Sequence, residues 1–279
     1  MAQLSIAALV VYPLKSAAGC SVAEAAFTPT GLAFDRTWAA VRAGTGRFIS
    51  QRVHPKMALI SARLSAPELL AGADAEADAA LILTAPGAGE LRVPLAPAGA
   101  RALVEASVWG WKGLAADEGD AAAAWLSAFL GVDARLVHYV GVAAGGTADA
   151  RARRAVKSEF VPAAAAGEVA FADSFPLLVA THASLDALNA EIGGGAALPI
   201  NRFRPNVLVA GAAPWEEDSW VRLALGGAGG AEGGGGVVLE FGQPCGESSC
   251  VLGRPVEAGT IPETNQQTNH AIITVHCPK

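Results

Sequence analysis

The sequence predicts an α+β fold that is rich in β structure, and three observations support this prediction. Short apolar segments separated by Gly and Pro fill residues 1–100, a pattern that is typical of a β-sandwich or β-barrel. Two later stretches carry apolar residues at the spacing of one helix face. A further short apolar run, residues 207–210, follows the second of these stretches and predicts a buried strand.

The composition allows a sizeable core and excludes a nucleic-acid surface of the usual kind. The chain has 279 residues, of which 52% are apolar and 16% are charged. This length fits one large domain or two smaller ones. The formal net charge is −6, whereas a nucleic-acid-binding domain usually has a basic excess.

The cysteines do not form a recognisable disulfide or zinc pattern. Cys20, Cys245, Cys250 and Cys277 are irregularly spaced and contain no CxxC pair, so we expect a reducing compartment. The N-terminal residues are apolar but lack the basic start of a signal peptide. No window of about 18 residues has the composition of a membrane helix. These features together predict a cytoplasmic protein.

The first hundred residues predict strands that are separated by turns. The first strand covers residues 6–12 and ends at Pro13. Two segments around a Gly-containing turn predict a hairpin, and further strands follow. The expected strands after the first one are residues 38–41, 48–51, 57–64, 81–84 and 91–94.

The second part of the chain predicts two helices between further strands. Asp120 is expected to cap a helix that ends at Gly131, and Ser184 is expected to cap a helix that ends at Gly193. Strands are expected at residues 134–140 and 177–180. Residues 142–166 and 226–236 have the composition of loops. We expect two domains, residues 1–100 and residues 101–279.

One polar cluster is the strongest candidate for a binding site. Asn201, Arg204 and Asn206 lie directly before the apolar strand at residues 207–210. Polar groups so close to a core are costly unless they are paired, so a binding role and a structural role are about equally supported. Arginine suits phosphate or carboxylate, and the thiols of Cys245 and Cys250 are soft metal ligands.

Four other positions carry chemistry, and each also has a simpler explanation. Lys15 follows the first strand and can hold an anion, although a lone lysine is more often a solvated loop residue. Asp35 and Arg36 can form a surface ion pair, and His54 fits an exposed loop better than a proton donor. Asp173-Ser174 can bond a polar heterocycle or form a turn before the next strand. The sequence contains no phosphate-binding glycine motif, zinc-protease motif or nucleophile elbow.

A set of motifs in a fixed order resembles the MOSC family of molybdenum enzymes, and within it the amidoxime-reducing branch. The motifs include Tyr12-Pro-Leu-Lys-Ser16, Gly31-Leu-Ala-Phe-Asp-Arg36, Phe48-Ile-Ser-Gln-Arg52, Asp173-Ser-Phe-Pro176, Asn201-Arg-Phe-Arg-Pro-Asn206, Glu217-Asp-Ser-Trp220 and Pro244-Cys245. The resemblance covers roughly residues 3–246. It implies an N-terminal MOSC-type β-barrel domain joined to a MOSC β-barrel domain with flanking helices.

The resemblance also implies the molybdenum cofactor, a pterin dithiolene with an anionic phosphate tail. The residues at the matching positions are then expected to bind the pterin and its phosphate. This predicted cofactor-binding set consists of Lys15, Ser16, Arg36, Arg52, Asp173, Ser174, Asn201, Arg204 and Asn206.

The cysteine element departs from the family pattern. The family carries a Pro-Cys-x-Arg-Cys element whose second cysteine binds the metal. Here Pro244-Cys245 begins that element, and its continuation returns only at residues 260–268, so residues 247–259 resemble an insertion. Cys250 within that stretch is the predicted catalytic and metal-binding residue, and Cys245 is the alternative. The last residues also lack the family's closing strands, which predicts an altered C-terminal end with an unpaired barrel edge.

The function that the resemblance implies is removal of oxygen from N-hydroxylated compounds such as amidoximes and hydroxylamines, with reduction of nitrite to nitric oxide as a related activity. It implies cytochrome b5 and NADH-cytochrome b5 reductase as electron donors, nitrate reductase as a further partner, and an association with mitochondria. Two alternatives remain open. The altered cysteine element favours a non-catalytic carrier of the molybdenum cofactor, and an unstable splice product would be poorly soluble with a molten near-UV signal.

Overall fold

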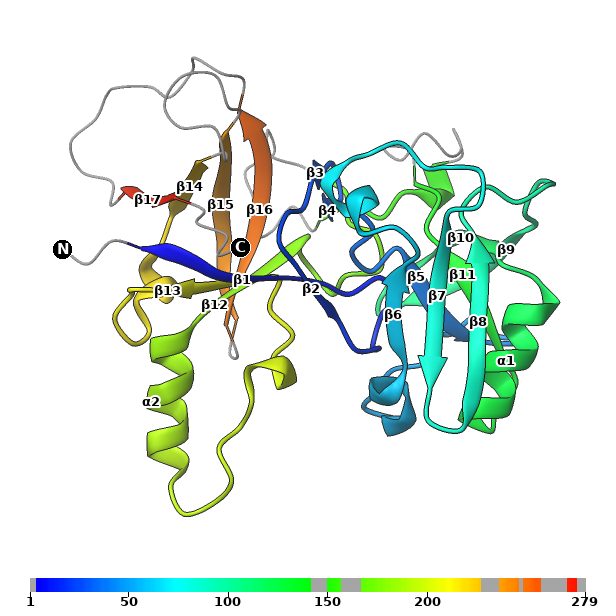
Figure 1. The fold of residues 1–279 in the computed structure, drawn as a ribbon, viewed down its shortest axis with the longest axis horizontal. Helices are drawn as coiled ribbons and strands as arrows, with labels where there is room; N and C mark the ends of the chain where they lie inside the picture. The colour runs from blue at the N-terminus through cyan, green and yellow to red at the C-terminus, as the bar shows by residue number, and fades with distance from the viewer. Residues whose placement is uncertain are drawn as a thin grey trace. The chain divides into compact units, whose positions relative to one another are not determined.

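The computed structural model describes residues 4–141, 150–156, 167–226, 236–245, 248–256 and 270–274 (Figure 1). The chain divides into two compact units. Unit 1 comprises Met1–Val10, Lys157–Ala165 and Ser174–Lys279, and unit 2 comprises Val11–Val156 and Ala166–Asp173. Both units are rich in strands and each contains one α-helix, which confirms the predicted fold class. Residues 100 and 101 lie within unit 2, and the domain division proposed there stays a prediction.

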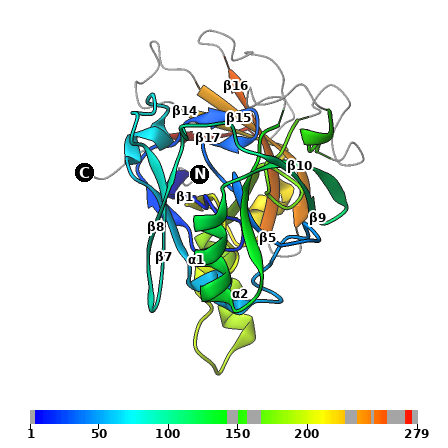
Figure 2. The same ribbon diagram turned by 90° about the vertical axis from the view of Figure 1, so that its right-hand side faces the viewer.

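Unit 2 contains antiparallel sheets made mostly of short strands. A four-stranded sheet has the order β5 (Trp38–Arg42), β11 (Ala134–His138), β10 (Trp111–Asp117) and β9 (Leu103–Val108). A three-stranded sheet consists of β6 (Ser61–Leu64), β7 (Ala80–Ala85) and β8 (Ala88–Pro94), and its long β7–β8 hairpin is visible in Figure 2. The remaining strands of this unit are β2 (Cys20–Val22), β3 (Phe27–Thr28) and β4 (Gly31–Leu32).

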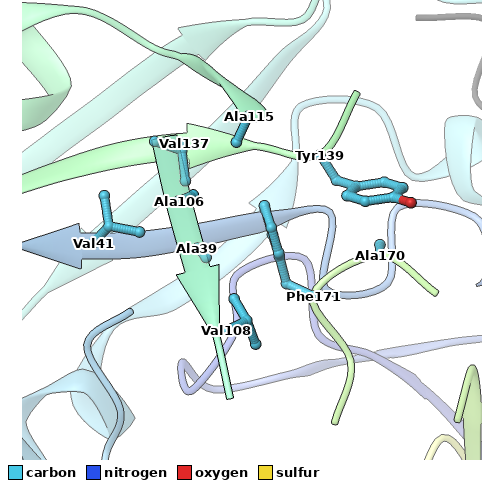
Figure 3. Close-up of a cluster of buried hydrophobic side chains, with 9 residues drawn as sticks. All are labelled: Ala39, Val41, Ala106, Val108, Ala115, Val137, Tyr139, Ala170 and Phe171. Carbon is cyan, nitrogen blue, oxygen red and sulfur yellow. The ribbon is translucent and has the colours of Figure 1, made fainter. Parts of the chain in front are cut away.

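The core of unit 2 forms around Phe171, which is fully buried. The Phe171 ring meets the Tyr139 ring edge-on with 5.6 Å between centroids. Small aliphatic residues from the four-stranded sheet surround the two rings (Figure 3). Burial of the Phe171 side chain fixes the segment that continues to Asp173, a predicted cofactor-binding residue.

Three local predictions for unit 2 need correction. Residues 48–51 do not form a strand, and Phe48 makes only an isolated bridge to Val41. Residues 57–59 are not a strand, because Pro55 opens the 3₁₀ helix η1 (Pro55–Leu59) and its fixed φ suits a first helical position. The helix α1 (Asp120–Leu130) ends at Gly131 as predicted. Its N-cap is Gly119 rather than Asp120, and the Gly119 N–H donates to Asp117 Oδ1 at 2.7 Å.

In unit 1 the first and the last strand of the sheet order also pair with each other. The order is β13 (Val207–Ala210), β12 (Leu177–Thr181), β16 (Ser248–Val256), β15 (Gly236–Cys245), β14 (Arg222–Gly226), β17 (His270–Thr274) and β1 (Ser5–Val11). Strand β1 also pairs antiparallel with β13, and its contact with β17 joins Ser5 to Thr274. The predicted unpaired edge at the end of the chain is therefore wrong, because β17 pairs with both β14 and β1.

The stretch that resembles an insertion forms part of this sheet. Residues 248–256 are strand β16, which pairs with β15 on one side and with β12 on the other. Consecutive apolar residues make up most of β12 and β13, and Val179, Val207 and Val209 are fully buried. The segment around Cys250 is thus a central strand of unit 1.

The N-cap of helix α2 (His182–Ile192) lies three residues before the predicted cap, Ser184. Thr181 is the N-cap, and its Oγ1 accepts a hydrogen bond from the Ser184 N–H at 3.1 Å. The Thr181 and Ser184 hydroxyls also bond to the buried carboxylate of Glu217. Ser184 is therefore part of a buried polar network rather than the cap itself. Among the described residues, neither helix is long and apolar enough to cross a membrane.

Candidate functional site

Lys15 in unit 2 is a buried cation and not the solvated loop lysine of the simpler explanation. It follows β1, and its backbone N–H donates to the Trp38 carbonyl at 2.8 Å. The ammonium group donates to the Phe171 carbonyl at 2.8 Å and to Asp173 Oδ1 at 2.6 Å. An ammonium group has three donors, and the described residues engage two of them.

Burial disfavours the charged form of Lys15. Burial lowers its pKa from the ordinary value of 10.5 to about 8, although Asp173 acts to raise it and Arg154 and Arg36 repel it. An anion placed beside this group would therefore stabilise the protonated form. The site favours a negatively charged ligand below about pH 8.

Asp173 links Lys15 to an aromatic side chain that the sequence analysis did not identify. The indole Nε1–H of Trp109 donates to the same Asp173 Oδ1 at 2.8 Å. Partial desolvation of the carboxylate acts to raise the pKa of Asp173, but Lys15 and the Trp109 hydrogen bond overcome this effect and hold the pKa well below its usual range. Asp173 itself is largely exposed, so it joins the buried lysine to the surface.

Arg36 forms an ion pair with its neighbour Asp35, as the simpler explanation proposed, but this pair is buried. Its guanidinium bonds to Asp35 Oδ2 and lies 4.5 Å from the centroid of the Tyr12 ring. The other Asp35 oxygen accepts from the Tyr12 N–H at 2.8 Å. The Arg36 carbonyl accepts from Phe171 N–H at 2.9 Å, which ties Arg36 to the segment that also holds Lys15.

Several predicted residues have a backbone conformation that is unfavourable for side chains other than glycine. The φ angles are 69° at Ser16, 47° at Arg36 and 59° at Arg204. Trp109 has φ of 53° in the two-residue turn between β9 and β10. Such strained residues concentrate at functional sites in proteins. This observation is independent of the motifs that predicted the site.

Arg154 is a further residue of this region that sequence reasoning missed. It is 7% exposed, and its guanidinium donates to the carbonyls of Ala170, Ala172 and Asp173. Burial lowers its pKa to about 10. The sequence gives no signal for this role, because Arg154 lies in an Ala/Gly/Arg-rich stretch next to the equally basic Arg153.

Arg52 and His54 lie on the surface of unit 2. The Arg52 guanidinium lies 5.6 Å from the Trp109 ring centroid, and Lys15 Nζ lies 5.8 Å from the same centroid. His54 Nε2 contacts Arg42 Nη2 at 2.9 Å, which fits the simpler explanation of a loop histidine. The structure thus brings Lys15, Arg36 and Asp173 together in unit 2, with Arg52 beside Trp109.

In unit 1, the Asn206 side chain has a structural role, because it bonds to the backbone of two other strands. It is 1% exposed, its Oδ1 accepts from the Leu178 N–H at 3.2 Å, and its Nδ2 donates to the Val10 carbonyl at 3.1 Å. The Asn206 N–H donates to the Leu178 carbonyl at 2.8 Å. Asn206 therefore fixes the starts of β12 and β13 against β1.

The other predicted residues of unit 1 are more accessible. Asn201 is exposed in the 3₁₀ helix η6 (Ile200–Arg202), and Ser174 is exposed as well. Arg204 is half-buried between η6 and β13. Arg204 and Asn206 come from one short segment, so the backbone geometry that seats Asn206 also sets the position of Arg204.

The two candidate cysteines are located by strand register. Cys250 in β16 pairs with Leu178 in β12 and with Gln243 in β15. Cys245 lies at the end of the β15–β16 hairpin, where it pairs with Ser248. Cys250 is therefore directly beside the residue that Asn206 binds. Within the part of the chain whose side chains are described, no group of three or more His, Cys, Asp or Glu is arranged to hold a metal ion.

We expect the Lys15 pKa to respond to Asp173. In the wild type, an NMR titration of labelled lysine side chains should show one group near pH 8. Asp173→Asn should lower this pKa further, because it removes the charge that counteracts burial. Since the folded pKa lies below the unfolded one, the Lys15 contribution to the free energy of unfolding should rise with pH between about 8 and 10.5.

The control for this titration is Lys112→Met, which should leave the low group in place, whereas Lys15→Met should remove it. A titration in which all lysines behave as ordinary exposed groups would contradict the buried, paired position of Lys15.

Comparison with known proteins matches both parts of the chain to family models. Residues 3–133 match the MOSC N-terminal beta barrel domain, and residues 166–269 match the MOSC domain. A protein named mitochondrial amidoxime-reducing component 1 from Mus musculus is 31% identical over 227 residues, which are 80% of this chain and 60% of that protein. The human protein of that name is 30% identical over 229 residues, again 80% of this chain and 60% of the relative.

A second named relative gives the same result. Mitochondrial amidoxime reducing component 2 from Bos taurus is 31% identical over 228 residues, which are 80% of this chain and 61% of that protein. The chain thus spans about three fifths of the length of the curated relatives that it matches.

Proposed function

Because the chain belongs to the MOSC-domain family and resembles its amidoxime-reducing components, we propose that it is a molybdenum-cofactor-dependent reductase of N-hydroxylated compounds. The observation that carries the proposal is the buried ammonium group of Lys15, in which the described residues engage two of three donors and whose pKa is lowered to about 8. A buried cation of this kind needs an anionic ligand more than a surface lysine does.

The residues present in unit 2 fit an anionic pterin phosphate. Lys15 supplies a point charge and Arg36 supplies a planar guanidinium, which are the side chains that bind phosphate best. Asp35 and Asp173 compensate part of this charge, and they orient the two cations. Arg154 donates to the carbonyls of Ala170, Ala172 and Asp173. It thereby fixes the segment that contains the Phe171 carbonyl, to which Lys15 donates, so the donors on Lys15 keep a fixed direction.

The residues of unit 1 fit the other requirements of the cofactor. Cys250 is our proposed metal ligand, with Cys245 as the alternative, and thiolate is a suitable ligand for a soft metal site. Asn206 fixes the backbone of Leu178, the strand partner of Cys250. Arg204 and Asn201 add donors from the segment before β13. These residues belong to unit 1, whereas Lys15 and Arg36 belong to unit 2.

The proposed reaction removes one oxygen atom from a nitrogen. When bound, the molybdenum centre supplies a metal that accepts oxygen and exchanges electrons one at a time. In the overall reaction, an R–NH–OH group takes up two electrons and two protons, its N–O bond breaks, and R–NH₂ and water are released. Reduction of nitrite to nitric oxide, with one electron and two protons and release of water, belongs to the same proposal.

The protein's own part is to bind, orient and shield. Lys15 and Arg36 neutralise the anionic cofactor, and burial excludes water around them. We propose cytochrome b5 with NADH-cytochrome b5 reductase as the source of electrons, and nitrate reductase as a further partner. The sequence contains no nucleotide-binding glycine motif of its own, which agrees with dependence on a partner.

The test is the cofactor content and the turnover of the purified protein. After expression in a host that makes the cofactor, we expect molybdenum and pterin in near-equal amounts, and reduction of an aromatic amidoxime to the amidine by a reduced viologen dye. Lys15→Met should lower the pterin content by about tenfold or more, since it removes a charge-assisted contact of about 1.5–3 kcal/mol.

Two outcomes would contradict this function. Bound pterin without turnover by any dye would favour the alternative, a non-catalytic carrier of the molybdenum cofactor. A protein that folds but binds neither pterin nor molybdenum would remove both readings. Lys56→Met is the matched control, because Lys56 is exposed and is expected to leave the pterin content unchanged.

A further inference from the structure

Unit 2 contains a segment in which all charges are positive. Between Asp35 and Glu68 the sequence has no carboxylate, but it has six cations, namely Arg36, Arg42, Arg47, Arg52, Lys56 and Arg63. The chain as a whole has a formal net charge of −6. A local excess of this kind creates a positive field on an otherwise acidic molecule.

Four of these cations form what we call the basic patch, namely Arg42, Arg47, Arg52 and Lys56, and all four are exposed. Within the described part of the chain, no carboxylate forms an ion pair with any of the four. By contrast, Arg63 and Arg92 on the β6–β8 sheet both lie within 4 Å of Glu90, at 3.6 and 3.9 Å. The charge of the basic patch is therefore not neutralised by direct contacts.

The four cations of the basic patch come from the last residue of β5, from η1 and from the chain segment that joins them. The Arg42 N–H donates to the Arg47 carbonyl at 2.8 Å, and Arg42 Nη2 lies 2.9 Å from His54 Nε2. Val53, which follows Arg52 in the sequence, is an apolar side chain that is 72% exposed. The backbones of Glu105 and Asp133 lie next to this segment, where the Ala43 N–H donates to the Asp133 carbonyl at 3.1 Å.

The basic patch also reaches the predicted cofactor-binding residues. The Arg52 guanidinium lies 5.6 Å from the centroid of the Trp109 ring, and Lys15 Nζ lies 5.8 Å from the same ring. Trp109 is 50% exposed and donates to Asp173. A surface cation and the buried ammonium group thus both lie within 6 Å of one indole ring.

We propose that the basic patch is the docking surface for an acidic protein that delivers electrons to this chain. The proposal rests on the proposed reductase function. An acidic donor is repelled by a molecule of net charge −6 unless a local positive surface guides it, and complementary charges accelerate such encounters. An electron donor must also approach the cofactor, and the contact through Trp109 provides that proximity, which a lipid- or nucleic-acid-binding surface does not need. Each encounter delivers one electron, so two encounters supply one amidoxime reduction.

The test compares two double variants with the same change of charge. Arg47→Glu with Lys56→Glu reverses two cations of the basic patch, and Arg63→Glu with Arg92→Glu is the matched control on the β6–β8 sheet of the same unit. The donor is a soluble acidic cytochrome b5 domain kept reduced by its reductase, and a reduced viologen dye serves as the small donor. At low ionic strength we expect kcat/KM for the protein donor to fall at least about tenfold in the patch variant.

The dye separates this proposal from the proposed function. Dye-driven turnover should be equal in wild type and both variants, and the loss with the protein donor should shrink as salt is added. Equal protein-driven rates in the wild type and the patch variant would overturn the docking surface, as would an equal loss in the control. Binding of the patch to anionic lipid vesicles, with protein-driven rates unchanged in the patch variant, would show a membrane surface instead. Absence of dye-driven turnover in every form would reject the proposed function itself.

Discussion

Cys250→Ala is expected to remove molybdenum from the purified protein and to reduce amidoxime turnover to background. A metal-bound thiolate cannot be replaced by a methyl group, and removal of a residue that merely supports a metal ligand already lowers affinity or activity about 10- to 100-fold. We therefore expect a loss greater than a hundredfold. Pterin content should fall much less, because in our proposal Lys15 and Arg36 bind a different part of the cofactor.

The measurement is metal analysis beside turnover with a reduced dye, and two cysteines serve as controls. Cys245 pairs with Ser248 at the end of the β15–β16 hairpin, whereas Cys250 pairs with Leu178 in the middle of the sheet. Cys245→Ala should keep molybdenum and activity. Cys20, which is half-buried in unit 2, should tolerate alanine in the same way. If Cys245→Ala were inactive while Cys250→Ala kept its metal, the ligand would be Cys245.

Arg154→Met should lower the free energy of unfolding by about 3 kcal/mol, which is the usual range for breaking a buried charged hydrogen-bond network. The methionine fills most of the space of the arginine stem, but it leaves the carbonyls of Ala170, Ala172 and Asp173 without their donor. Buried carbonyls without partners are costly. The segment that carries Phe171 and Asp173 should then loosen.

Urea unfolding followed by tryptophan fluorescence measures this loss, and Arg153→Met is its matched control. The Arg153 side chain is half exposed and lies 3.8 Å from Glu168, so its loss should cost less than about 1 kcal/mol. Similar stability of the two variants would contradict the role of Arg154. Hydrogen exchange at residues 170–173 should rise only in the Arg154 variant.

Sequence alone was sufficient for the elements whose residues carry a strong local pattern. The apolar run before Ala210 is strand β13, and Gly131 ends α1 in a left-handed conformation. The ordered motifs likewise indicated the family, and the matches to both MOSC domain models confirm it. These features depend on neighbouring residues, so they are readable without knowledge of the rest of the chain.

The local predictions that failed did so because a competing interaction decided the outcome. Asp120 and Ser184 are good capping residues, yet Gly119 and Thr181 are the N-caps. Ser184 instead donates to the buried carboxylate of Glu217, which lies 33 residues away along the chain. Residues 248–256 were not predicted as a strand, and pairing with β12 and β15 makes them a central one; that residues 247–259 are an insertion stays a prediction.

The sequence determined which residues of the candidate site are polar and in which order they occur, and the tertiary structure decided what they do. Lys15 and Asp173 are 158 residues apart, and only the fold places the ammonium group 2.6 Å from the carboxylate. Burial of the ammonium group turns an ordinary lysine into one with a pKa of about 8, although Asp173 acts to raise it. Desolvation and long-range contacts of this kind depend on the packed chain, and no local pattern encodes them.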